Sequence, residues 1–516
     1  MLAIRRLRKR LISTINAGVY IEPYGCQMNM NDAEVVLGIL ENYKSNLTDG
    51  FNESYYKFCR SDLENADVAL LVTCAIREHA ENKIWIRINE LSKIRTKSKQ
   101  KLTIGVLGCM AERLKEKFLE KEGKVDIVCG PDAYRDLPKL IESVMLDGGS
   151  ALNVALSLEE TYADVRPVRL NQSSKSAFVS IMRGCNNMCA YCIVPFTRGR
   201  ERSRSITTII NEIEDLKNQG VKEITLLGQN VNSYNSVNDE SILQYNTELS
   251  NGFSSISRSR DEGMKFAELL DLTSLKFPEI RFRFTSPHPK DFPDALLHVI
   301  RDRPNICKQI HLPAQSGSSR ILERMRRGYS REAYLNLVAH IRLIIPDVSL
   351  SSDFITGFCG ETQEDHQESL DLIKQVDYDM AYIYAFSMRE KTMAHRRYFD
   401  DVDQKTKSRR LREMLDLFYE LAKIRTKSYV GTDQLVYVEG PSKKDSDVLS
   451  GRADNNKTVL FESRADLVPS IGDFVHVNIN GSIGLSLKGE IHAISSVSEF
   501  QKLKYLSLPS SQHQDQ

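Results

Sequence analysis

Three cysteines stand close together in the middle of the chain. Cys185, Cys189 and Cys192 have the spacing CxxxCxxC and follow an apolar run at residues 178–182. Soft thiolates favour iron–sulfur clusters, copper(I) or zinc. A structural zinc site usually has four protein ligands, and no histidine or fourth cysteine lies nearby in the sequence. We therefore predict an iron–sulfur cluster with one iron left open, because four cysteines are the usual complement. A zinc knuckle, or three unrelated thiols, is the alternative.

A second set of three cysteines is spread over the first part of the chain. Cys26, Cys74 and Cys109 each come just after a short apolar run that is typical of a buried strand. The carboxyl ends of parallel strands lie at one edge of a sheet, where ligands bind. The three thiols are therefore expected to converge on a second metal site with an open position. The alternative is three buried structural cysteines, which is how we interpret Cys129.

The elements around these cysteines form a predicted parallel α/β domain at residues 18–150. Its strands are expected at residues 19–21, 67–72, 102–107 and 125–130, with helical stretches between them. Short apolar strands that alternate with helices pack as a parallel sheet. Residues 151–172 are interpreted as a connector.

A second α/β domain is predicted at residues 171–403. Strand candidates recur around residues 178–182, 222–228, 281–285, 308–312, 348–354 and 380–386. Six such βα units predict a partial (β/α)6 barrel with its active site at the carboxyl ends of the strands. The CxxxCxxC loop follows the first strand, so it is expected on that face. A Ser/Asn-rich segment at 235–263 is interpreted as a mobile surface insertion.

The last part of the chain changes character. Residues 404–428 have the pattern of a basic amphipathic helix, and residues 429–498 have short strands separated by glycine-containing turns. This pattern predicts a small β-barrel. The polar tail at 499–516 is expected to be disordered. The fold class is thus α/β, with a small C-terminal β-barrel.

The amino-acid composition excludes several classes of protein. The chain has 516 residues, 41% of them hydrophobic and 27% charged, and a formal net charge of +1. Its overall field does not attract a polyanion, so a nucleic-acid surface has to be local. Ten cysteines in so long a chain do not form a disulfide framework, and they indicate metal ligation or catalysis. No apolar run is long enough to span a bilayer.

Residues 1–17 are rich in arginine and contain no acidic residue. A basic, helix-capable segment of this kind is typical of an organellar transit peptide. We therefore expect mitochondrial localisation, with the cytoplasm as the alternative. A basic surface helix or a misplaced start of translation explains the same pattern.

Six motifs together make the chain resemble the MiaB family of radical-SAM methylthiotransferases, in particular its eukaryotic branch. The resemblance extends from residue 19 to about residue 491. The motifs are YGCQMN at 24–29, TCAIRE at 73–78, GCMAER at 108–113, the run 183–204, HLPAQSGS at 311–318 and GRADNNK at 451–457. Their combination is far more specific than CxxxCxxC alone.

The resemblance implies two 4Fe–4S clusters and S-adenosylmethionine. The Cys185/Cys189/Cys192 cluster would cleave S-adenosylmethionine to a 5′-deoxyadenosyl radical. The Cys26/Cys74/Cys109 cluster would carry or donate the sulfur, which a second S-adenosylmethionine methylates. An aromatic C–H bond is not attacked by ordinary acid–base groups, so a cofactor has to supply the reactivity.

The expected enzyme is a radical-SAM tRNA-2-methylthio-isopentenyl-adenosine synthase. Its substrate would be isopentenyl-adenosine at position 37 in the anticodon stem-loop of tRNA, modified at carbon 2. An electron donor and a sulfur source are implied as partners. The alternatives are a methylthiotransferase for threonylcarbamoyl-adenosine or a ribosomal protein, and a non-catalytic iron–sulfur interaction protein. The two complete sets of cysteines argue against the last.

Further site residues are weaker predictions. Gln229, Ser286, Gln315 and Asp353 fall at the expected barrel mouth and are candidates for S-adenosylmethionine or substrate contacts.

Four basic residues are candidates for contacts with RNA. Arg198 and Arg200 have the guanidinium fork that pairs with phosphate, and Arg452 and Lys457 lie in the C-terminal module, which resembles a TRAM domain. Acidic residues outnumber basic ones in that module. It is therefore not a generic basic clamp for phosphates.

Overall fold

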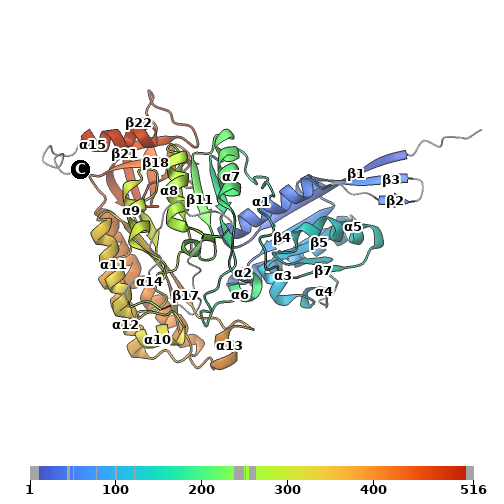
Figure 1. The fold of residues 1–516 in the computed structure, drawn as a ribbon, viewed down its shortest axis with the longest axis horizontal. Helices are drawn as coiled ribbons and strands as arrows, with labels where there is room; N and C mark the ends of the chain where they lie inside the picture. The colour runs from blue at the N-terminus through green and yellow to red at the C-terminus, as the bar shows by residue number, and fades with distance from the viewer. Residues whose placement is uncertain are drawn as a thin grey trace, which may run out of the picture. The chain divides into compact units, whose positions relative to one another are not determined.

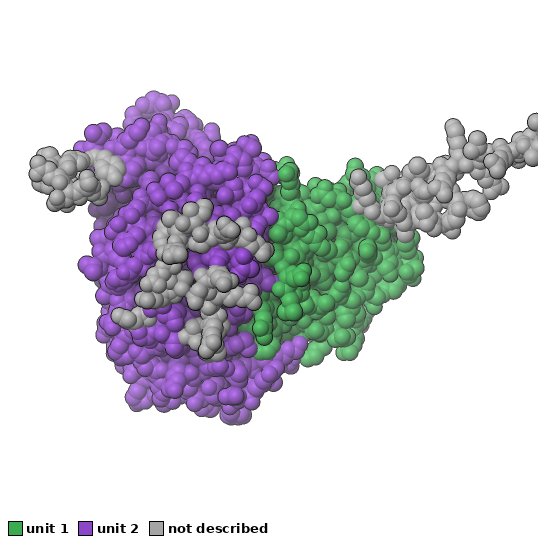
Figure 2. Space-filling view, viewed as in Figure 1, with its two compact units in different colours: residues 1–172, 193–200 green, residues 173–192, 201–516 purple. Residues whose placement is uncertain are grey.

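The computed structural model describes residues 11–43, 47–49, 52–76, 78–98, 101–120, 123–237, 249, 252–254 and 263–506. The chain folds into two compact units, which are coloured separately in Figure 2. Unit 1 comprises residues 1–172 and 193–200, and unit 2 comprises residues 173–192 and 201–516.

Unit 1 is built on one sheet with strand order β2-β3-β1-β4-β5-β6-β7. The strands are β1 (Leu11–Pro23), β2 (Leu47–Asp49), β3 (Asn52–Arg60), β4 (Val68–Thr73), β5 (Thr103–Gly108), β6 (Ile127–Cys129) and β7 (Ala151–Asn153). All neighbours pair in parallel except β2 and β3. Every residue of β4 and β5 is buried, as expected for strands covered on both faces.

Helices cover both faces of this sheet. They are α1 (Gln27–Glu41), α2 (Glu78–Ser98), α3 (Cys109–Leu114), α4 (Lys117–Glu120), α5 (Leu137–Asp147) and α6 (Val194–Thr197), with 3-10 turns at Leu63–Asn65 and Tyr134–Asp136. One core joins α1 and α5 to the sheet through residues such as Val36 and Ile141. The other joins α2 and α3 to the opposite face through Ile88 and Ala111.

Unit 1 differs from the prediction at both of its predicted boundaries. Residues 11–17 are the first half of β1 and pair with β3, so the predicted boundary at residue 17 cuts a strand. Residues 1–10 lie outside the described part. The expected connector contains β7, which adds to the sheet edge. The edge strands β2 and β7 have three residues each, and so short a strand carries a weak periodic signal. The strand β3, which lies between β2 and β1, was not predicted either.

Unit 2 contains the predicted partial (β/α)6 barrel, which we call the half-barrel. Its six strands are β8 (Ser176–Ser180), β11 (Glu223–Leu227), β14 (Arg281–Phe284), β15 (Gln309–His311), β16 (Ser349–Thr356) and β17 (Met380–Ala385). They form two parallel three-stranded sheets. A bridge between Phe282 and Ile306 links the two. Helices such as α11 and α12 run along the outer side of these strands (Figure 1).

The remaining elements of this half-barrel region are connecting helices and short pairs of strands. The helices are α7 (Ile206–Asn218), α8 (Phe266–Lys276), α9 (Asp294–Asp302), α10 (Ser319–Arg324), α11 (Arg331–Ile344), α12 (Gln363–Val376), α13 (Met393–Arg397) and α14 (Gln404–Lys427), with a 3-10 turn at Val231–Ser233. The short strands are β9 (Met182–Arg183), β10 (Arg202–Ser203), β12 (Asn235–Ser236) and β13 (Met264–Lys265). Most of the predicted insertion at 235–263 lies outside the described residues.

A closed five-stranded barrel completes unit 2, in the order β18-β19-β20-β22-β21. Its strands are β18 (Asp433–Pro441), β19 (Val448–Arg452), β20 (Thr458–Glu462), β21 (Phe474–Ile483) and β22 (Ser486–Ser495). Residues 499–506, which belong to the tail predicted to be disordered, are instead part of helix α15 (Val497–Leu506). Val497 and Phe500 pack on Tyr437 and Phe474 of the barrel, and this burial accounts for the helix. Residues 507–516 lie outside the described part.

A buried charge cluster fastens this barrel to the half-barrel. Glu223, the first residue of β11, accepts hydrogen bonds from Arg281 at 2.6 Å and Arg283 at 3.1 Å. The same guanidinium groups donate to the carbonyl oxygens of Leu435 at 3.0 Å and Ala453 at 2.6 Å. The C-terminal barrel is therefore attached at the amino ends of the half-barrel strands, away from their carboxyl ends.

Within the described residues, no helix is long and apolar enough to cross a membrane.

Candidate metal centres

Three neighbouring strands of unit 1 bring Cys26, Cys74 and Cys109 to one edge of the sheet. Cys26 precedes α1 as its N-cap residue, Cys74 directly follows β4, and Cys109 is the first residue of α3 after β5. Cys74 and Cys109 are buried and Cys26 is exposed. The thiols of Cys26 and Cys74 are hydrogen-bonded, which lowers the pKa of Cys26. The predicted convergence of these three cysteines is thus present in the fold.

Two glycines allow the chain to approach this closely. Gly25 has φ +108°, and a Cβ there would lie 2.6 Å from Cys74 Cβ. Gly108 has φ +88°, and a Cβ there would lie 2.8 Å from the carbonyl oxygen of Thr73. Only glycine adopts such backbone angles freely. Side chains at these two glycines would fill the space beside the three thiols. Three soft thiols around such a space fit an iron–sulfur cluster, and the exposed Cys26 leaves one edge of the site open.

Arg198 also reaches this edge from helix α6, whose C-cap it forms, within unit 1. Its Nε donates to Cys109 Sγ at 3.1 Å, and its Nη2 lies 2.5 Å from Asp32 Oδ2. The side chain is 4% exposed. The prediction that Arg198 contacts RNA is therefore wrong, because a phosphate cannot reach this guanidinium. Arg200 is exposed and stays a prediction.

The CxxxCxxC loop of unit 2 follows β9. Cys185 and Cys189 are buried and Cys192 is half-buried. Burial, Glu201 and the other two cysteines of the loop all raise the pKa of Cys185. Three thiols that repel one another's charge in a buried loop are stabilised as thiolates by a cationic centre. The donor set therefore fits a metal cluster.

Hydrogen bonds from neighbouring segments hold the loop. Gln229 Oε1 accepts from the Gly184 amide at 2.5 Å. Asn186 and Glu201 bond reciprocally, with the Asn186 amide 3.1 Å from Glu201 Oε1 and the Glu201 amide 3.2 Å from Asn186 Oδ1. The structure thus gives Gln229 a role in positioning the loop. Its predicted contact with the cofactor stays a prediction.

Two of the other candidates have unusual backbone angles. Ser286 has φ +60° and Gln315 has φ +70°, and they follow β14 and β15 at the carboxyl ends of the strands. Non-glycine residues in this region are strained, and such residues cluster at functional sites. Asp353 lies inside β16, where its Oδ2 is 3.2 Å from His311 Nε2. Contacts of these three residues with S-adenosylmethionine remain predictions.

Arg327 is a buried cation beside the CxxxCxxC loop that the sequence does not predict. Its Nη1 donates to Cys189 Sγ at 3.4 Å and to the Tyr191 hydroxyl at 3.2 Å, and its Nη2 donates to the Pro313 carbonyl at 3.1 Å. It lies 138 residues after Cys189 and belongs to no spacing motif. Only the fold shows that a buried cation faces this loop.

Among the side chains that the structure describes, no group of three or more histidine, cysteine or acidic residues is arranged around one metal ion. A 4Fe–4S cluster is larger, because each of its cysteines binds a different iron atom.

The two candidate RNA contacts of the C-terminal barrel are already engaged in the structure. Lys457 Nζ lies 3.1 Å from Thr426 Oγ1 and 3.2 Å from the Asp379 carbonyl, and its side chain is 3% exposed. The prediction that Lys457 contacts RNA is therefore wrong, since its ammonium joins the barrel to α14. Arg452 is paired with Glu439 at 3.2 Å on the surface and stays a prediction.

Comparison with known proteins matches family models to all three parts of the fold. The Radical SAM superfamily model matches residues 179–373, "Uncharacterized protein family UPF0004" matches 18–130, and the TRAM domain matches 427–491. A CDK5RAP1-like protein of Oryza sativa subsp. japonica is 53% identical over 94% of this chain and 82% of its own. The mitochondrial tRNA methylthiotransferase CDK5RAP1 of Homo sapiens is 52% identical over 92% of this chain and 81% of its own.

The similarity extends to bacteria. The tRNA-2-methylthio-N(6)-dimethylallyladenosine synthase of Flavobacterium johnsoniae is 46% identical over 93% of this chain and 95% of its own. The chain belongs to the MiaB-type radical-SAM methylthiotransferase family. The predicted family, fold class and cofactors, two 4Fe–4S clusters and S-adenosylmethionine, are confirmed. The residues that hold each cluster of this methylthiotransferase stay predictions.

A solved structure is also similar. The radical S-adenosylmethionine methyltransferase TsrM from Kitasatospora setae, with cobalamin and a 4Fe–4S cluster bound, aligns with a TM-score of 0.47 and 13% identity. The alignment covers 73% of this methylthiotransferase chain and 72% of TsrM.

Proposed function

We propose that this chain adds a methylthio group to carbon 2 of isopentenyl-adenosine at position 37 of tRNA. The observation that carries the proposal is the presence of two complete cysteine triads, each at the carboxyl ends of parallel strands in its own unit. An interaction protein has no need for two such sites. The bacterial relative named as a tRNA-2-methylthio-N(6)-dimethylallyladenosine synthase supports this substrate.

We assign one cluster to Cys185, Cys189 and Cys192 and the other to Cys26, Cys74 and Cys109. When bound, the first cluster supplies the electron that cleaves S-adenosylmethionine, and the second supplies sulfur. The chain's own residues keep the first site in shape. Gln229 fixes the start of the loop through Gly184, and Glu201 holds Asn186 in its middle.

Strained backbone prepares the barrel mouth for S-adenosylmethionine. The Gln315 amide donates to the Asp353 carbonyl at 2.8 Å, and the Gln315 carbonyl accepts from Ile355 at 2.9 Å. These two bonds hold Gln315 in its unusual conformation. A backbone that is already fixed before binding loses little entropy when the cofactor arrives.

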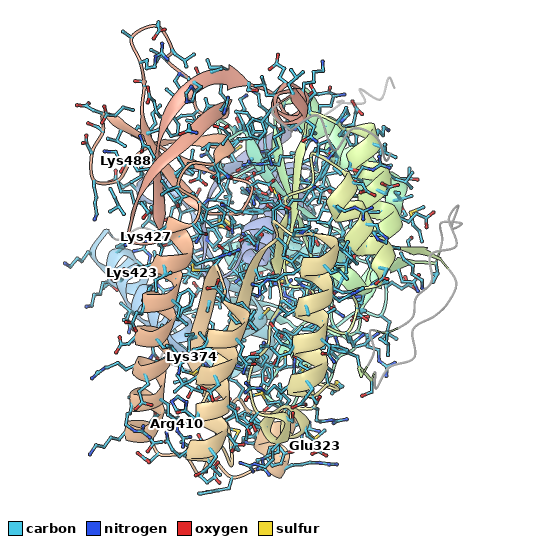
Figure 3. All side chains as sticks on the ribbon, turned by 90° about the vertical axis from the view of Figure 1, so that its left-hand side faces the viewer. Glu323, Lys374, Arg410, Lys423, Lys427 and Lys488 are labelled. Atoms are coloured by element: carbon cyan, nitrogen blue, oxygen red, sulfur yellow. The ribbon has the colours of Figure 1, made fainter. Side chains whose placement is uncertain are left out.

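We place part of the tRNA surface at the junction of α14 and the C-terminal barrel. Figure 3 shows Lys423 and Lys427 near the C-terminal end of α14, and Lys488 above them on the barrel in this view. All three residues are exposed. Exposed ammonium groups attract backbone phosphates and release counterions when they bind. By contrast, Arg410 of the same helix is buried against Glu361 at 2.8 Å.

The names of the relatives support a cellular setting. The CDK5RAP1 proteins of human and mouse are named as mitochondrial, which supports a mitochondrial location for this chain. An electron donor and a sulfur source complete the reaction. A reporter fused to residues 1–20 tests the location, and a cytosolic signal would contradict it.

The decisive experiment is mass spectrometry of nucleosides from tRNA of a deletion strain. We expect the strain to lose 2-methylthio-isopentenyl-adenosine and to accumulate isopentenyl-adenosine. Wild-type protein restores the modification, whereas Cys185→Ala and Cys74→Ala do not. Unchanged methylthio-isopentenyl-adenosine in both organellar and cytosolic tRNA would contradict the proposal. The same digest shows whether threonylcarbamoyl-adenosine is the substrate instead.

The two cysteine variants separate the roles of the triads. We expect Cys185→Ala to abolish cleavage of S-adenosylmethionine, because its cluster no longer forms. Cys74→Ala should retain part of the cleavage and make no methylthiolated product. The measurement is release of 5′-deoxyadenosine by the purified, reconstituted protein. Product formation by the Cys74 variant would show that the sulfur-donor assignment is wrong.

A further inference from the structure

A buried ion pair stands directly behind one cysteine of unit 1. Arg198 Nη2 lies 2.5 Å from Asp32 Oδ2, and the two side chains are 4% and 0% exposed. The other edge of the same guanidinium faces Cys109, with Nε 3.1 Å from Sγ. One arginine thus connects a carboxylate to a sulfur.

Several groups fix the orientation of this guanidinium. Asn29 Oδ1 accepts a second hydrogen bond from Nη2 at 3.2 Å, and Asn29 itself is held by a bond to the Tyr24 carbonyl at 2.5 Å. The Tyr134 hydroxyl donates to Asp32 Oδ2 at 3.4 Å. The arginine therefore has a defined geometry before any metal binds.

Stability alone does not explain this arrangement. A buried ion pair is costly to desolvate, and apolar side chains of similar size are often as good or better. Surrounding side chains such as Ile193 and Ala75 are apolar and pack against Cys109. A buried cation in apolar surroundings stabilises an anionic group that forms beside it. The Cys109 sulfur becomes anionic when it binds iron.

We propose that Arg198 is a positioning residue of the sulfur-donor cluster, which donates a charged hydrogen bond to Cys109 and raises the reduction potential of that cluster. Hydrogen bonds to the sulfurs and local charge set the potentials of iron–sulfur clusters. A cation beside a ligand sulfur stabilises the more negative, reduced form. Asp32 acts through Arg198 by holding its fork, as carboxylates hold metal-binding histidines in other sites. The inference rests on the proposed assignment of Cys26, Cys74 and Cys109.

Cys74 provides an internal comparison. Its sulfur accepts from the backbone amide of Ile76 at 3.5 Å, a longer bond from a neutral donor. Charge-assisted bonds are shorter and stronger. Loss of the Arg198 hydrogen bond to Cys109 should therefore change the reduction potential of the cluster more than loss of the Ile76 hydrogen bond to Cys74.

The test uses full-length protein in which Cys185, Cys189 and Cys192 are replaced by alanine, so that only the donor cluster remains. Arg198→Gln and Arg198→Lys are introduced in this background and reconstituted without oxygen. Iron and sulfide per chain, the midpoint potential followed by electron paramagnetic resonance, and the rate of iron loss to a chelator are measured. The control is Arg95→Gln, which breaks an arginine–aspartate pair of unit 1 at 3.0 Å from Asp126.

We expect Arg198→Gln to bind iron with a potential more negative than the parent, and to lose iron about 10-fold faster. Arg198→Lys should fall in between, because lysine keeps the charge but loses the planar fork. Arg95→Gln should match the parent. A parental potential in Arg198→Gln would overturn the inference. If Arg198→Gln does not fold, a parental potential in Arg198→Lys overturns it equally. If the parent itself binds no iron, the cluster assignment fails and the inference with it.

Discussion

At the scale of single residues, each cysteine triad has a buried arginine that donates a hydrogen bond to one of its sulfurs. Arg327 is buried and donates to Cys189, and Arg198 does the same for Cys109 in the other unit. Buried guanidinium groups hold their charge at any physiological pH. Each triad of this methylthiotransferase therefore has a fixed positive charge next to one of its sulfurs.

The role of Arg327 is testable in the CxxxCxxC cluster. With Cys26, Cys74 and Cys109 replaced by alanine, Arg327→Gln should make the potential of the remaining cluster more negative. Cleavage of S-adenosylmethionine should slow by about 10-fold, since the reduced cluster loses its charge partner. Tyr329→Phe removes a neutral partner of Arg327 at 3.0 Å and should leave the potential nearly unchanged. Equal potentials in the parent and Arg327→Gln would show that Arg327 only supports the fold.

A second residue-scale prediction concerns His288. Burial, together with the cations Arg327 and Lys290, lowers the pKa of His288 well below its usual value. The unfolded chain therefore takes up a proton below about pH 6.5 that the folded chain does not. Stability should fall as the pH drops through this range, by up to about 1.4 kcal/mol per pH unit for this one group. His288→Gln should reduce the slope of unfolding free energy against pH between about 6.5 and 5. An unchanged slope would show that His288 does not contribute.

At the scale of elements, most of the fold was predictable. The six half-barrel strands were expected within a few residues of where they lie, because strand candidates recur between helical stretches at the spacing of βα units. The strands β2 and β3 and helix α15 were not expected. Each owes its structure to a partner elsewhere in the chain, as α15 does to Tyr437 and Phe474.

The attachment of the C-terminal barrel gives an element-scale prediction. Glu223→Gln leaves Arg281 and Arg283 buried without their carboxylate, which should cost about 3–5 kcal/mol in unfolding free energy. Urea denaturation measures this. Glu214→Gln, which loses only a surface pair with Lys217, should change it by less than about 0.5 kcal/mol. Similar values for both variants would mean that the buried cluster does not fasten the barrel.

At the scale of the whole molecule, the near-neutral charge requires a local RNA surface. Only exposed cations can serve, and burial removes Arg198 and Lys457 from the candidates. The exposed lysines at the end of α14 and on the barrel remain candidates (Figure 3), together with Arg200 and Arg452.

This surface predicts a change in the salt dependence of tRNA binding. Lys423→Gln together with Lys427→Gln should weaken binding and lower the slope of log K against log salt by about 2, one for each phosphate contact. Binding of a labelled anticodon stem-loop at several salt concentrations measures it. Lys217→Gln, an exposed lysine on α7, is the control. An unaltered slope in the double variant would place the RNA elsewhere.

The sequence by itself predicted the two cysteine triads, the parallel strands that carry them and the family. Cysteine spacing and apolar periodicity are local patterns, and they can be recognised in the sequence without knowledge of the fold. Only the tertiary structure decided what the basic residues do. Asp32, which forms an ion pair with Arg198, lies 166 residues from it in the chain. Asp379, whose carbonyl accepts a hydrogen bond from Lys457, lies 78 residues from that lysine. Burial and pairing depend on such distant partners, so residue type alone cannot separate a cation that binds RNA from one that supports a metal centre or a domain junction.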